Sequence, residues 1–124
     1  MSPSTLRYCL RIARQLVELP DGKSKHFAYL LAGGKIVGFG YNKHRSHTYH
    51  SRWSDPARPP AIHAEAAAVF STRKQGDELV VVRVNRQGAV RLSKPCVCCC
   101  SFLQYRGIKR VWFTTEVGWE KMYI

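Results

Sequence analysis

Four of the chain's five cysteines fall within residues 95–100, Pro-Cys-Val-Cys-Cys-Cys. Cys96 and Cys99 are three positions apart, a spacing that on a helix places both sulfurs on one face, where they can bind one metal ion. A helix N-terminus also stabilises thiolates, because its free amide groups and its dipole favour negative charge. Cysteines this close in sequence favour metal or redox chemistry over a disulfide framework.

His63 and Glu65 supply the groups that the cysteine pair lacks. They begin an expected helix, and the strand 80–84 that follows would bring both helix starts to one edge of a sheet. One histidine and two cysteines make three protein ligands, the number typical of a catalytic zinc site whose fourth position is left to water. Zinc lowers the pKa of that water to about 7, and Glu65 is close enough to take its proton without binding the metal.

The two motifs together resemble the signature of the zinc nucleobase deaminases, H-x-E followed by P-C-x-x-C. The chain is similar over nearly its whole length to the cytidine deaminase-like superfamily, and most similar to its small, phage-type members. The resemblance implies that His63, Cys96 and Cys99 hold one Zn²⁺ with a bound water. It also implies that Glu65 is the catalytic general acid and base.

The resemblance extends to substrate contacts. Residues 34–42, GKIVGFGYN, look like a segment of deoxycytidylate and tRNA-adenosine deaminases in which the asparagine contacts the nucleoside, which implies that Asn42 binds substrate. Ala64 and Pro95, inside the two motifs, are implied to lie at the substrate as well. The helix that the tRNA and polynucleotide deaminases place between their last two strands has no room here.

Residues 42–60 form a long segment rich in cationic and aromatic side chains. Long loops in compact domains are often functional, and aromatic side chains beside cations suit stacking on bases and contact with phosphate. We therefore expect substrate contacts from Lys43, Arg45, Tyr49 and Trp53, with a packing role for Tyr49 or Trp53 as an equal alternative. His44, His47 and His50 could instead form a second metal site, but three histidines in a loop are a weak signal, and solvated or phosphate-facing roles are favoured.

The periodicity of apolar residues predicts an α/β fold of the cytidine deaminase-like kind, with α-β-α layers. We expect a mixed five-stranded sheet with helices on both faces, and a Gly33-Gly34 turn between the first two strands. Only residues 116–118 separate the last two strands, which must therefore be antiparallel. The expected helices are 5–19 (capped by Ser4 or Thr5), 61–74 and 95–107, and the expected strands are 27–32, 35–41, 78–84, 108–115 and 119–124, with 89–92 as an extension.

Composition sets further bounds. The 124 residues are expected to form a single domain, 1–124, and 45% of them are hydrophobic. No apolar run reaches the roughly 20 residues that span a bilayer, and the N-terminus does not read as a secretory signal. We therefore expect a cytoplasmic protein with no membrane partner. The formal net charge of +12 predicts attraction to phosphate.

The favoured function is conversion of cytosine to uracil in single-stranded nucleic acid, because the charge of +12 exceeds what one phosphate requires. The near-equal alternative is deamination of free cytidine, deoxycytidine or their monophosphates. A further alternative is a non-enzymatic nucleic-acid-binding module with structural zinc, in which Cys98 or Cys100 adds a fourth ligand. A thiol redox protein would leave His63 and Glu65 unexplained. Relatives of this size often form dimers or larger oligomers, so the sequence leaves both a monomer and a homo-oligomer open.

Overall fold

The computed structural model describes residues 2–20, 24–42 and 63–124. Its elements are α1 (Pro3–Gln15), β1 (Lys25–Ala32), β2 (Lys35–Tyr41), α3 (Ala64–Phe70), β3 (Glu78–Val84), β4 (Val90–Arg91), α4 (Val97–Tyr105), β5 (Arg110–Thr115) and β6 (Gly118–Tyr123). The expected order of helices and strands is confirmed. No helix within these ranges is long and apolar enough to cross a membrane.

The strands form one mixed sheet in the order β2-β1-β3-β5-β6. β3 and β5 are parallel, because α4 crosses between them, and the other neighbours are antiparallel, including the last pair as predicted. The sheet has six strands rather than five, since the two residues of β4 pair with Arg83 and Val84 of β3. β4 lies within the extension expected at 89–92.

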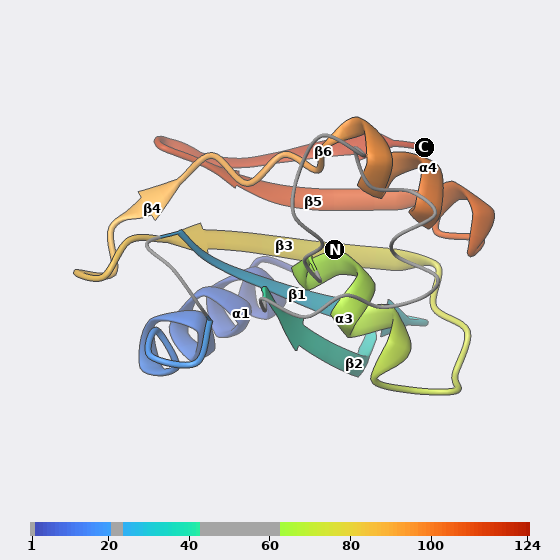
Figure 1. The fold of residues 1–124 in the computed structure, drawn as a ribbon, viewed down its shortest axis with the longest axis horizontal. Coiled ribbons are helices and arrows are strands. Elements are labelled where there is room, and N and C mark those ends of the chain that lie inside the picture. Colours follow the sequence, from blue (N-terminus) through green and yellow to red (C-terminus); the bar gives the residue numbers. More distant parts are fainter. Residues whose placement is uncertain (1, 21–23, 43–62) are drawn as a thin grey trace.

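Helices cover both faces of the sheet, as expected. α1 packs on one face, over alternate residues such as Tyr29 and Val82. α3 and α4 pack on the other, over residues such as Leu30 and Val81. Figure 1 shows α3 in front of β1 and β2. The alternation along each strand sets which side chains face α3 and α4.

Helix boundaries differ from those expected. α1 begins at Pro3 with Ser2 as its N-cap, because the Ser2 hydroxyl accepts the Ser4 amide and proline suits the first helical position. It ends at Gln15 rather than at 19. α3 stops at Phe70, where the Ser71 hydroxyl donates to the Ala68 carbonyl and accepts the Phe39 amide of β2. α4 begins after Pro95, at Val97.

The Gly33-Gly34 turn is confirmed, with φ of 58° and 82°, the left-handed conformation that a two-residue hairpin turn requires. Gly40 serves a different purpose. A Cβ there would lie 2.3 Å from the Ala68 amide nitrogen. β2 and α3 are therefore in backbone contact, and that contact places the start of α3 on the sheet.

Gly40→Ala should lower the free energy of unfolding by about 2–3 kcal/mol, because backbone atoms of α3 cannot yield to a new methyl group as a side chain could. Urea denaturation of the zinc-loaded protein, followed by circular dichroism, measures this. Lys35→Ala, at an exposed position of the same strand, is the control. Equal stability of both variants would contradict the close contact.

Candidate active site

The starts of α3 and α4 meet over the sheet and bring the two sequence motifs together. His63 is the N-cap residue of α3, and Cys96 is the N-cap residue of α4, with Cys99 in the first turn. The crossover from α3 through β3 to α4 produces this meeting, since β3 is central in the sheet. The expectation that the intervening strand would join the motifs is confirmed.

The three donor atoms are clustered. His63 Nδ1 lies 3.0 Å from Cys99 Sγ and 3.8 Å from Cys96 Sγ, and all three atoms lie within 4.8 Å of one another. Tetrahedral zinc with bonds of about 2.0–2.3 Å separates its nitrogen and sulfur ligands by roughly 3.5–3.8 Å. The spacing and the chemistry of the donors therefore fit Zn²⁺, with Nδ1 as the histidine ligand.

The pKa values of Cys96 and Cys99 shift in opposite directions. Hydrogen bonds with Cys99 and His63 lower the pKa of Cys96 to about 3. The hydrogen bond with Cys96, together with burial, raises the pKa of Cys99. The cluster thus stabilises a thiolate on Cys96, the form that binds metal.

Glu65 lies directly beside the donors. It is 5% exposed, and burial raises its pKa, although a hydrogen bond with Cys99 and the charge of His63 oppose that rise. A carboxyl group whose pKa lies above its ordinary value gives up a bound proton less readily, and a carboxyl group can both accept and donate a proton, as general acid–base chemistry requires. Among the described residues, it is absent from the group of potential metal ligands, which contains only His63, Cys96 and Cys99.

The remaining predicted site residues have different surroundings. Ala64 and Pro95 are buried within the two motifs. The Asn42 side chain accepts the His26 amide through Oδ1 and donates to the Ser24 carbonyl through Nδ2, so it ties the end of β2 to the start of β1. Its contact with substrate stays a prediction. Lys43, Arg45, Tyr49 and Trp53 lie outside the described residues, as do His44, His47 and His50.

The sequence motifs missed two side chains near the site, His26 and Arg83. They are register partners on β1 and β3, and they share the face of Ala28 and Val81, under α3 and α4. Burial, the Arg83 charge and the His63 charge lower the pKa of His26 to about 4. The available signal was Arg83 itself, a cation that interrupts the apolar run of a central strand.

The other three cysteines lie outside the donor group, and of these only Cys9 belongs to a core cluster. Cys9 is fully buried between α1 and the sheet, and burial raises its pKa to about 12. The Cys100 thiol contacts the Pro95 carbonyl oxygen at 3.7 Å. All five cysteines are free thiols. Neither Cys98 nor Cys100 joins the group of three donors found in the described part of the chain.

A mixed sheet carrying a histidine and two cysteines at converging helix starts, beside a buried glutamate, defines the class of zinc-dependent hydrolases that deaminate bases. Residues 3–115 match the family "Cytidine and deoxycytidylate deaminase zinc-binding region". The chain belongs to this family, and the resemblance of its motifs to the cytidine deaminase-like superfamily is confirmed. It is a zinc-binding protein, with His63, Cys96 and Cys99 positioned to hold the metal.

Solved structures confirm the fold. The dCMP deaminase of cyanophage S-TIM5 in apo form is 20% identical over 93% of this chain and 86% of its own, with a TM-score of 0.61. The same enzyme in complex with dCMP and dUMP is 19% identical over 91% and 82%, with a TM-score of 0.63. The cytidine deaminase of Mycobacterium leprae is 17% identical over 93% and 91%, with a TM-score of 0.59. No curated protein sequence matches the chain.

Proposed function

We propose that this chain is a hydrolytic deaminase that converts cytosine to uracil in a cytidine nucleotide. The observation that carries the proposal is the placement of Glu65, a buried carboxyl group beside three metal donors. A structural zinc site ordinarily has four protein ligands, whereas the described residues offer three. A non-enzymatic zinc module would also leave Glu65 buried without a task.

Different residues of the chain would bind the metal and transfer the proton. His63, Cys96 and Cys99 would hold Zn²⁺, which when bound lowers the pKa of water to about 7 and so supplies hydroxide near neutral pH. Glu65 takes a proton from the attacking water and delivers it to the leaving nitrogen. One C–O bond forms at C4 of the base, the C–N bond breaks, and ammonia leaves. The free thiols favour a reducing compartment, so we place the reaction in the cytoplasm.

A free nucleotide is the substrate we favour. The S-TIM5 enzyme of similar fold is described in complex with dCMP and dUMP. The basic side chains of α1, Arg7, Arg11 and Arg14, are exposed, and α1 covers the sheet face opposite the metal donors. A strand bound on those arginines would have to pass around the sheet to reach Glu65. The positive charge of α1 is therefore not by itself evidence that a nucleic-acid strand binds at the active site.

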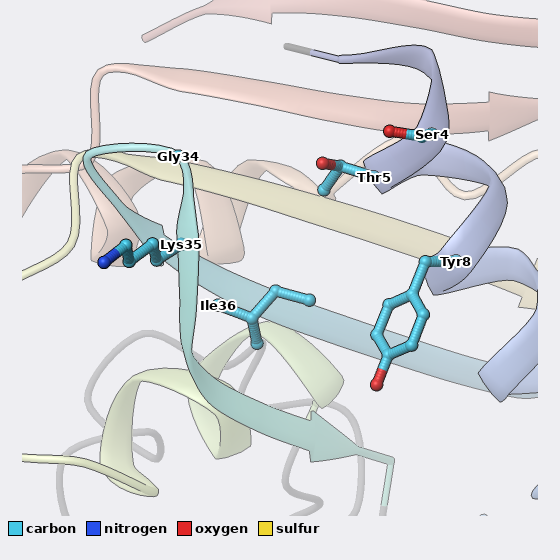
Figure 2. A pocket seen from close by; sticks show the side chains of 6 residues that line it. All are labelled: Ser4, Thr5, Tyr8, Gly34, Lys35 and Ile36. Carbon is cyan, nitrogen blue, oxygen red and sulfur yellow. The ribbon is translucent and has the colours of Figure 1, made fainter.

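Cytosine in single-stranded nucleic acid is the second candidate, supported by the charge of +12 and by an aromatic–cation pair on α1, provided that a strand bound there passes around the sheet to the active site. Arg11 lies over the half-exposed Tyr8 ring at 5.5 Å from its centroid. Figure 2 shows Tyr8 beside Ile36, in a hollow between α1 and the turn that ends at Lys35. An aromatic side chain among cations is a feature of single-strand binding surfaces. Self-association, which would also use exposed surface, stays a prediction.

Uracil formation from a panel of substrates tests the proposal. Purified zinc-loaded protein is offered cytidine, deoxycytidine, their monophosphates, single-stranded DNA and single-stranded RNA, and the products are measured by mass spectrometry at several salt concentrations. We expect dUMP or UMP to form at a rate that changes little with salt, since one phosphate is contacted. Product in the polymer alone, lost steeply as salt rises, would favour the second candidate. No uracil from any substrate would contradict both.

A further inference from the structure

Arg83 is a half-buried cation on the metal-site face of a central strand. Its guanidinium donates to the Leu92 carbonyl at 3.3 Å and to the Ser24 hydroxyl at 3.1 Å. Both partners are neutral, and no carboxylate of the described residues pairs with Arg83. Partial burial of a charge without a counter-ion costs free energy, and an anionic ligand would supply that counter-ion.

The position of Arg83 relates it to the metal donors through His26. The two residues are opposite each other on β3 and β1, and both face α3 and α4. His26 interacts electrostatically with Arg83 on one side and with His63 and Cys96 on the other. Arg83 is therefore one side chain removed from the metal site, at the carboxyl end of β3. Figure 1 shows this end of β3 beside β4 and the start of β1.

The Arg83 guanidinium has more hydrogen-bond donors than these two contacts use. Arginine carries five N–H groups, and within residues 2–20, 24–42 and 63–124 the Arg83 guanidinium makes two hydrogen bonds, which leaves further N–H groups able to bind oxygen. Arginine binds phosphate through paired N–H···O bonds, and the Ser24 hydroxyl beside it is an additional donor. In a nucleotide, the phosphate and the reacting C4 lie at opposite ends of the molecule. A nucleotide whose C4 lies at the metal donors therefore needs a separate anion-binding site for its phosphate. Arg83 lies on the same face of the sheet as the metal donors but apart from them, which fits this requirement.

We infer that Arg83, with Ser24, forms the subsite for the phosphate on the 5′ side of the reacting cytidine. This inference rests on the proposed function and specifies its substrate class, a phosphorylated cytidine rather than a nucleoside. The phosphate can belong to a free monophosphate or to the phosphodiester of a strand, and the chemistry of the subsite is the same for both.

A purely structural role makes a different prediction. Arg83 joins the segment at Leu92 to Ser24, and if this were its whole purpose, its loss would loosen the site for every substrate. Turnover of deoxycytidine and of dCMP would then fall by the same factor. If Arg83 binds phosphate, its loss instead lowers turnover of dCMP more than turnover of deoxycytidine, because deoxycytidine has no phosphate.

The experiment compares Arg83→Gln with the zinc-loaded parent, using deoxycytidine, dCMP and a short thymidine strand that contains one cytosine. Arg73→Gln, at an exposed position beyond the C-terminal end of α3, is the control for loss of one charge. We expect Arg83→Gln to lower the ratio of kcat/KM for dCMP to that for deoxycytidine by about tenfold or more, as charged hydrogen bonds are worth this much. Arg73→Gln should leave the ratio unchanged.

An unchanged ratio in Arg83→Gln, together with unchanged activity on the strand, would overturn the subsite. Equal kcat/KM values of the parent protein for deoxycytidine and dCMP would also overturn it. A fall in activity on the strand but not on dCMP would assign the subsite to a phosphodiester. Calorimetric binding of dCMP and deoxycytidine to the same proteins separates this inference from the proposed function. Without turnover by the parent, tighter binding of dCMP that depends on Arg83 would retain the subsite, and equal binding of both would reject it.

Discussion

Glu65→Gln is expected to lower kcat for cytosine deamination by about a thousandfold, the scale of a lost general acid–base group. Glutamine keeps the size and the hydrogen-bonding capacity of the side chain but cannot carry a proton from water to the leaving nitrogen. Zinc content should stay at one ion per chain, because Glu65 is not among the three clustered donors. Turnover by mass spectrometry and zinc by atomic absorption measure the two effects on the same sample.

The control for this variant is Glu120→Gln, which removes an acid from an exposed position of β6. It should retain the activity of the parent. Loss of zinc together with activity in Glu65→Gln would make Glu65 a metal ligand rather than a proton carrier. Full activity in Glu65→Gln would remove the observation on which the proposed function depends.

Cys99→Ser is expected to abolish both stoichiometric zinc binding and turnover. Cys99 is buried, and its sulfur is 3.0 Å from His63 Nδ1, so its replacement by a poorer ligand leaves two strong donors. Catalytic zinc requires three. The melting temperature of the parent should rise with added zinc, because a ligand that binds only the folded state stabilises it. That rise should be lost in Cys99→Ser.

Cys98→Ser provides the matched comparison, since Cys98 is the preceding residue of the same helix. It should bind one zinc ion and remain active, because its sulfur is not among the clustered donors. Zinc loss from Cys98→Ser would instead show a fourth protein ligand. That outcome would favour the structural-zinc module over the enzyme.

The metal donors could be predicted from the sequence because their spacing is local. Cys96 and Cys99 share one helical turn, and His63 and Glu65 are two residues apart, so only the approach of two helix starts had to be inferred. The hairpin turn at Gly33-Gly34 was predictable for the same reason. Alternation of apolar residues likewise indicated helices on both faces of the sheet.

The position of Arg83, the end of α3 and the hydrogen bonds of Asn42 depended on contacts between residues far apart in sequence. Arg83 reaches Ser24 across 59 positions, and no motif relates the two. The Ser71 hydroxyl ends α3 partly because it accepts the Phe39 amide of a neighbouring strand, which helix propensity alone does not include. The amide of Asn42 belonged to a recognisable segment, but its bonds to the backbone of Ser24 and His26 followed only from the pairing of β1 with β2.

The origin of the product's oxygen tests the central claim most directly. Zinc-loaded protein and dCMP are incubated in water enriched in oxygen-18, and dUMP is examined by mass spectrometry, with Glu65→Gln in parallel. The account predicts dUMP with one oxygen-18 at C4 and an equal amount of ammonia, and almost none of either from Glu65→Gln. dUMP without the label, or the same yield from Glu65→Gln as from the parent, would contradict hydrolysis by a water that Glu65 deprotonates.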